Sequence, residues 1–248
     1  MRQIWVVCGE ELRRAVKSAG TYSLFTLFFL VTGILYLSVF FQASVEPQRY
    51  SPLQLFWELQ WLPNLLWVPL LTMRLFSPER RVGLLESALA TPTTPAAIVV
   101  GKYLSALLLY CIGWASVVLY MLITRFSGLT AAELGYIFTP TAIIGGAVFC
   151  LSSGVLFLAF GLWCSSLTRN TILAGALTVC LMMLYMILPT MLGAVVPKGW
   201  GFLRPFHHLE NLSAYTSGSI ELSVVVAYII GAVVILFAAM MALEQRGD

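Results

Sequence analysis

Long apolar runs recur six times along the chain, and each is close to the roughly 20 residues that a helix needs to cross a bilayer. We therefore expect six transmembrane helices. Their expected spans are 21–42, 54–75, 97–123, 139–164, 171–195 and 222–243. The first run is too long for the apolar core of a signal peptide and lacks a small-residue cleavage site, so we expect it to be retained as a helix.

One segment between the second and third runs interrupts this pattern with five charged residues from Arg74 to Glu86. Burying these charges in the hydrocarbon would cost on the order of 10 kcal/mol, so we expect the segment to lie outside it. Its residue order predicts a short helix. Ser77 suits the N-cap, Pro78 the first helical position and Glu79 the positive start of the helix.

This helix is expected to cover residues 77–90, because Pro92 stops it. Val82, Leu85 and Leu89 recur at spacings of three and four and form one apolar stripe. The helix either lies flat on the lipid surface or docks a soluble partner. Docking would use the stripe together with its charged neighbours. The candidate docking residues are Arg74, Ser77, Glu79, Arg80, Arg81, Val82, Leu85, Glu86 and Leu89.

Residues 1–20 predict a second amphipathic helix that leads into the first span. Its expected apolar face holds Ile4, Cys8, Leu12, Ala15 and Val16. The opposite, polar face holds Glu10, Arg13, Arg14 and Lys17. We expect the helix to lie at the membrane interface, and its candidate contact residues are Glu11, Arg13, Arg14 and Lys17.

Composition agrees with a membrane protein, because 60% of the residues are hydrophobic and only 10% are charged, against about 25% charged in soluble domains. With both termini on the cytoplasmic side, ten Lys and Arg residues lie in the inner segments and four in the outer ones. This asymmetry follows the positive-inside rule. It also accounts for the net charge of +3, which therefore does not indicate nucleic-acid binding.

The chain lacks the motifs of the common catalytic and nucleotide-binding sites. It has no G-x-x-x-x-G-K-[ST] loop, no H-E-x-x-H and no G-x-S-x-G, so we expect no enzyme activity and no cofactor in this chain. Adjacent His207 and His208 give only weak evidence for a metal. Glu58 and Asn64 form a candidate intramembrane polar site, although an interfacial position would also explain Glu58.

Two features concern packing. Gly146, Cys150 and Gly154 form a ridge of small residues that allows another helix to approach, either within the chain or from a second subunit. Pro189 predicts that the last turns of the fifth span are kinked or broken. The outer segment, 196–221, predicts an interfacial helix with an aromatic belt, and a short re-entrant hairpin covered by protein would also fit.

Three stretches together resemble the permease subunit of ABC type-2 exporters, in the gliding-motility-type branch. They are "CGEELRRAVKSAGTYSLFTLFFLVTG", "TMRLFSPERRVGLLESALATPTTPAAIVVGKYLSA" and "LRPFHHLENLSAYTSGSIELSVVVAY". The middle stretch carries the most specific likeness. Departures from the family pattern are Leu84 before Leu85–Glu86, where the family has threonine, and Thr216–Ser217–Gly218 in the third stretch, where the family has Arg-Gly.

The resemblance implies a single transmembrane domain over residues 1–248, all-α, with six helices and both termini cytoplasmic. It implies that helix 77–90 couples this domain to a cytoplasmic ABC ATPase, which would hold the ATP and Mg²⁺. It further implies a second permease copy or a larger membrane subunit, and the bacterial inner membrane as the location. The alternative function is a membrane anchor that holds a cytoplasmic partner and transports nothing.

Overall fold

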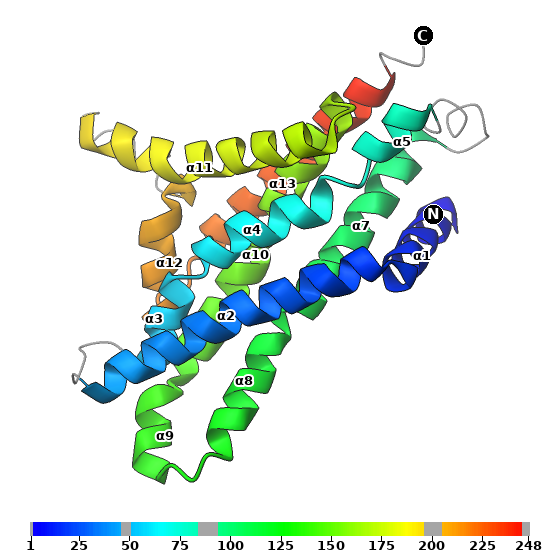
Figure 1. Cartoon of the computed structure of the whole chain (residues 1–248). Coiled ribbons are helices and arrows are strands. Elements are labelled where there is room, and N and C mark those ends of the chain that lie inside the picture. Colours follow the sequence, from blue (N-terminus) through cyan, green and yellow to red (C-terminus); the bar gives the residue numbers. More distant parts are fainter. Residues whose placement is uncertain (1, 46–50, 84–93, 196–204, 245–248) are drawn as a thin grey trace.

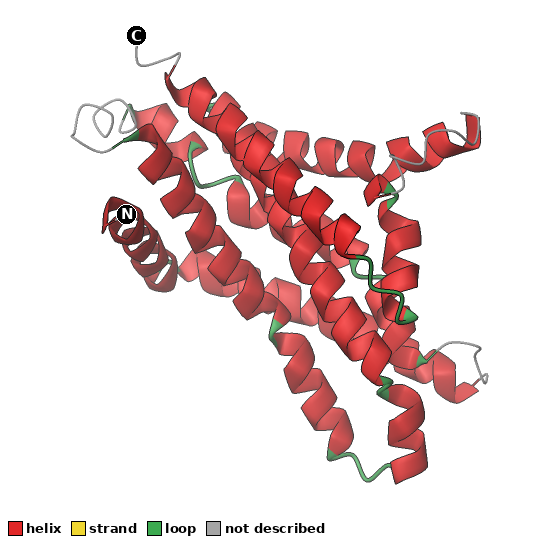
Figure 2. Cartoon of the chain, turned by 180° about the vertical axis from the view of Figure 1, so that it is seen from behind, coloured by secondary structure: helices red, strands yellow, loops and turns green. Residues whose placement is uncertain are grey.

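The computed structural model describes residues 2–45, 51–83, 94–195 and 205–244, and all regular structure in these ranges is helical. Figure 2 shows helices joined by short connections throughout this part of the chain. Within the described ranges, five helical segments are long and apolar enough to cross a membrane. They are Ala19–Gln42, Pro95–Arg125, Glu133–Leu167, Thr171–Pro189 and Leu222–Leu243. The expectation of an all-α integral membrane protein is confirmed.

The helices are labelled in Figure 1 and follow one another in chain order. They are α1 (Arg2–Lys17), α2 (Ala19–Val45), α3 (Pro52–Glu58), α4 (Trp61–Thr72), α5 (Ser77–Val82), α7 (Pro95–Trp114), α8 (Ser116–Arg125), α9 (Ala131–Ile137), α10 (Pro140–Leu167), α11 (Thr171–Val195), α12 (His208–Thr216) and α13 (Leu222–Glu244). In Figure 1, α5, the start of α7 and the ends of α10 and α13 gather at one end of the molecule, which we call the α5 end.

The second expected span, 54–75, is not one helix. The chain forms α3, breaks at Leu59 and Gln60, and continues as α4. Pro63 explains the break, because proline has no N–H and its ring clashes with the carbonyl four residues earlier. Here that carbonyl belongs to Leu59, where α3 has just ended. The prediction of a continuous second span is therefore wrong, and the segment crosses the fold as two short helices.

Helix α10 is the central element. Two thirds of its spanning window (67%) is buried inside the protein, against 22% to 33% for the other four spanning segments. The ridge of small residues explains how its neighbours come so close. An added Cβ at Gly146 would lie 2.4 Å from the Trp57 ring, and one at Gly154 would lie 2.3 Å from the Tyr110 ring. The ridge therefore serves packing within the chain.

Helix α11 runs as a single helix from Thr171 to Val195, with Pro189 inside it. The expected break is therefore absent, and the alternative of a kink at Pro189 stays a prediction. After it, residues 196–204 of the outer segment lie outside the described part of the chain. Helix α12 then packs against α3, α10 and α11, and Figure 1 shows it on the side of the molecule away from the α5 end. One face of α12 is buried against these helices (His208, Asn211, Leu212, Tyr215 and Thr216), while Leu209, Glu210 and Ser213 are exposed. Its position at the membrane interface stays a prediction.

The two neighbouring histidines of this segment have opposite surroundings. His208 is fully buried beside Phe149 and Phe157, and its Nδ1 lies 3.0 Å from the Tyr228 hydroxyl. Burial lowers the pKa of His208 to about 3, because a charged imidazole would lose its hydration, so the ring is neutral. His207 instead pairs with Glu210 at 3.1 Å on the surface. The two rings therefore diverge and do not form a common metal site.

Candidate functional site

The first turn of α5 is held by a serine from another helix. The Ser165 hydroxyl, on the last turn of α10, accepts hydrogen bonds from the backbone N–H groups of Phe76 (3.1 Å) and Ser77 (3.2 Å). It also donates to the Met73 carbonyl at 3.3 Å. Ser77 is not the N-cap predicted from sequence, because it is the first helical residue and its own hydroxyl lies 3.2 Å from that of Ser165. The cap is supplied by α10.

Helix α5 is shorter than predicted. It ends at Val82, because Gly83 adopts the left-handed conformation (φ 75°) that commonly terminates helices. The expected continuous helix over 77–90 is therefore wrong at this point. Residues 84–93 lie outside the described part of the chain, and with them the candidates Leu85, Glu86 and Leu89.

Four charged side chains from three helices meet beside α5, and we call them the ionic cluster: Glu11, Arg14, Glu79 and Lys102. Lys102 Nζ, on α7, donates to Glu11 Oε1 of α1 (2.6 Å) and to Glu79 Oε1 of α5 (3.0 Å). Arg14, also on α1, lies 3.0 Å from the same oxygen of Glu79 and 3.5 Å from that of Glu11. The cluster thereby joins α1, α5 and α7.

Lys102 is the central member of the cluster, because its side chain is only 4% exposed, while the glutamates are 17% and 21% exposed and Arg14 is 66% exposed. Burying an ammonium group costs several kcal/mol, which only well-placed anionic partners offset. Two carboxylates and the face of the Phe76 ring, 5.3 Å from Nζ, surround it. The buried ammonium group therefore depends on the positions of α1 and α5, which carry its two carboxylate partners.

The structure brings Glu11, Arg14 and Glu79 of the predicted site together and leaves other candidates apart. Arg13 and Lys17 are exposed and lie outside the cluster. Arg81 is exposed on α5, Arg80 is half-buried, and Arg74 is exposed just before α5.

The predicted face of α1 needs one correction. Cys8 is buried and Ile4, Leu12 and Ala15 are half-buried, as the apolar face requires, but Val16 is 60% exposed. Glu11 takes part in the covered face instead. The reason is Lys102, which draws this carboxylate against α7.

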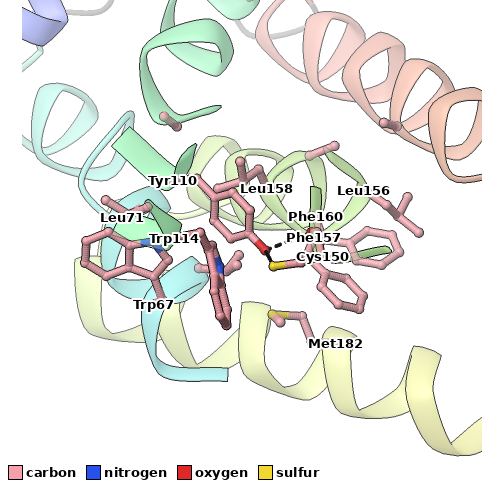
Figure 3. Packing of buried hydrophobic residues seen from close by; sticks show 14 of the residues in the cluster. Trp67, Leu71, Tyr110, Trp114, Cys150, Leu156, Phe157, Leu158, Phe160 and Met182 are labelled. Carbon is pink, nitrogen blue, oxygen red and sulfur yellow. Dashed lines mark hydrogen bonds between the residues drawn. The ribbon is translucent and has the colours of Figure 1, made fainter. Parts of the chain in front are cut away.

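The two residues of the candidate intramembrane polar site, Glu58 and Asn64, do not act together. Asn64 is buried, and its Oδ1 accepts hydrogen bonds from the Tyr110 hydroxyl (3.0 Å) and the Trp114 indole (3.3 Å). Figure 3 shows Tyr110 and Trp114 beside Cys150 in the core. Glu58 is half-buried, and its side chain makes no hydrogen bond or ion pair with any residue that the structure describes. Asn64 is therefore a packing residue that fixes α4 to α7.

Sequence reasoning missed Lys102 and Ser165. Lys102 did carry a signal, since it lies inside the expected third span, where a charged side chain requires a partner. Lys102 is one of the ten Lys and Arg residues assigned above to the inner segments, where a charge needs no partner. Ser165 carried no such signal, because a serine in an apolar helix usually bonds its own backbone. Its role depends on a contact with a residue 89 positions earlier.

Replacing Ser165 by alanine is expected to lower the free energy of unfolding by about 2 kcal/mol, because two buried N–H groups lose their acceptor. The apparent melting temperature in detergent should fall by about 4–8 °C. Ser166→Ala is the matched control, because Ser166 is equally buried and, among the residues that the structure describes, its hydroxyl bonds only the Trp163 carbonyl of its own helix. Equal melting temperatures for the two variants would contradict the capping role.

Among known protein families, one family model matches the chain. The family model of the ABC-2 family transporter protein matches residues 69–243, which is more than half of the chain. The matched range contains α5, Lys102 and Ser165, and leaves out α1 with Glu11 and Arg14. The chain matches none of the curated proteins with which it was compared.

Proposed function

Since the chain belongs to the ABC-2 family of transporter proteins, it is a membrane permease component of an ABC transporter, and we propose that it serves an ATP-driven exporter. In this proposal a separate cytoplasmic ABC ATPase, holding ATP and Mg²⁺, docks on α5. The permease itself catalyses nothing and binds no cofactor. The sequence likeness to the gliding-motility-type branch is part of the proposal.

The observation that carries the proposal is the attachment of α5 on two sides. Ser165 of α10 binds its first turn, and Glu79 binds Lys102 of α7 and Arg14 of α1. A six-residue helix is not stable alone, so α5 takes its position from these partners. A force applied to α5 by a docked ATPase would therefore reach α1, α7 and α10 together.

The proposed arrangement follows the charge asymmetry of the sequence. The α5 end faces the cytoplasm, both termini are cytoplasmic, and the protein is a multi-pass protein of the bacterial inner membrane. Two permease domains pair, either as two copies of this chain or as this chain with a larger membrane subunit. The exposed side chain of Arg81 gives the docked ATPase an electrostatic contact.

Charge reversal at Arg81 tests the docking. Arg81→Glu is expected to reduce co-purification of the ATPase from native membranes in mild detergent by about tenfold, because a reversed charge at an interface repels the partner group. Mass spectrometry of the eluate measures the amount and identifies a soluble subunit with a Walker A loop. Arg125→Glu is the control, because it reverses an arginine in the last turn of α8, outside the α5 end.

If both variants retain the ATPase equally, α5 is not the docking element. If the wild-type chain brings down no ATPase while other membrane complexes survive the detergent, the exporter proposal fails and the anchoring function becomes the better explanation. ATP-stimulated substrate movement in liposomes separates a transporter from an anchor that binds an ATPase.

A further inference from the structure

A cavity of about 280 Å³ lies beside the ionic cluster, between α1, α2, α4, α5 and α7. Its lining has two chemically different parts. Leu24, Leu70 and Leu109 line it from α2, α4 and α7, at positions inside the expected spans. Arg14 and Arg74 line it from the α5 end, and both are exposed. The cavity is thus apolar toward the spans and charged at its mouth.

The charges at the mouth are not balanced. Within the ionic cluster the two carboxylates face two cations, Lys102 and Arg14, so the cluster is neutral by itself. Arg74 adds one positive charge. It makes no ion pair with any carboxylate in the ranges that the structure describes.

The guanidinium of Arg74 lies over Gly20 at the start of α2, where an added Cβ would be 2.9 Å from Nη1. This glycine lets the arginine rest across the first turn of α2 and beside the cavity that Arg74 lines. The surplus charge is therefore part of the mouth of the cavity and does not simply extend into solvent.

We propose that this cavity binds an anionic phospholipid of the adjoining leaflet. The phosphate would pair with Arg74, since guanidinium groups bind phosphate through two parallel hydrogen bonds. Arg14, whose charge is balanced within the ionic cluster, would donate a further hydrogen bond from its exposed guanidinium. One acyl chain would lie along the three leucines. The carboxylates of Glu11 and Glu79 do not repel the phosphate strongly, because Lys102 and Arg14 bind both of them. A soluble phosphate would leave the leucine-lined part of the cavity without an occupant.

Native mass spectrometry of the purified, delipidated full chain tests the proposal. The chain is incubated with equal amounts of phosphatidylglycerol and phosphatidylcholine, and the bound lipid is counted. We expect wild type to retain phosphatidylglycerol preferentially, and Arg74→Gln to retain about tenfold less of it. Arg169→Gln is the matched control, since Arg169 is an exposed arginine in the α10–α11 connection and lines no part of the cavity. Both variants should melt as wild type does, which shows that they fold.

A second arm distinguishes the source of the phosphate. Glycerol phosphate in hundredfold excess is expected to leave the bound lipid in place, because it lacks the acyl chain. Displacement of the lipid by glycerol phosphate would identify a soluble phosphate as the ligand and overturn the proposal. Equal lipid retention by wild type and Arg74→Gln, or an equal loss in Arg169→Gln, would overturn it as well. None of these outcomes depends on the ATPase, so the proposed function is tested separately.

Discussion

Replacing Lys102 by methionine is expected to lower the free energy of unfolding by about 2–3 kcal/mol. Removing one partner from a fully buried ion pair costs about 3–5 kcal/mol, and we place the effect lower because Glu11 and Glu79 are 17% and 21% exposed. The loss arises because two neighbouring carboxylates keep only the exposed Arg14 as a counter-charge. The apparent melting temperature in detergent should fall by about 5–10 °C.

Two further variants separate charge from packing. Lys17→Met removes an exposed lysine of α1 that lies outside the cluster, and it should leave the melting temperature unchanged. The triple variant Lys102→Met, Glu11→Gln, Glu79→Gln removes the uncompensated carboxylates and should recover most of the loss, because neutral groups need no counter-charge. If Lys102→Met and Lys17→Met have the same melting temperature, the ionic cluster contributes nothing to stability.

Replacing Gly145 by alanine is expected to destabilise the protein by about 3 kcal/mol or more, the upper range for overpacking. The added Cβ would lie 1.9 Å from the Tyr215 carbonyl oxygen, whereas real Cβ contacts stay above 3.0 Å. This neighbour is backbone in the last turns of α12, so no side-chain rotation relieves the clash. Helices α10 and α12 must move apart, and the apparent melting temperature should fall by about 6–12 °C.

Gly135→Ala is the matched control for this substitution. Gly135 lies in α9, and an added Cβ there would meet no atom within 4 Å. Alanine is favoured over glycine in a helix by about 0.5–1 kcal/mol, so this variant should melt at the wild-type temperature or slightly above it. If the Gly145→Ala and Gly135→Ala proteins had the same melting temperature, α12 would not pack on α10 as described.

The hydrophobic pattern of the sequence was sufficient to predict most of the long helices, because an apolar run of spanning length has few alternatives in a membrane. It failed at the second span, where Pro63 in the first turn of α4 separates two helices. Proline alone was not a reliable guide, since α11 continues through Pro189 to Val195. The two prolines differ in their place in the helix: Pro63 lies in the first turn of α4, where proline is tolerated, and Pro189 lies inside α11.

The candidate site shows the same division between local and distant information. Glu79 in the first turn of α5 and the amphipathic character of α1 are local patterns, and both were predicted. The pairing of Lys102 with Glu11 joins residues 91 positions apart, and no spacing rule connects them. Gly83 was a local signal for the end of α5, because glycine commonly ends helices in the left-handed conformation, and the prediction of a helix over 77–90 did not include it.

The dependence of α5 on Ser165 has a consequence for biosynthesis. Phe76 and Ser77 leave the ribosome 89 and 88 residues before the serine that accepts their N–H groups. At about 5–20 residues per second, this delay is about 4–18 s. During that time α5 lacks its cap, and a single turn of helix has little stability of its own. The segment therefore becomes a helix only after α10 has been made, so a partner that recognises folded α5 selects chains whose membrane insertion is well advanced.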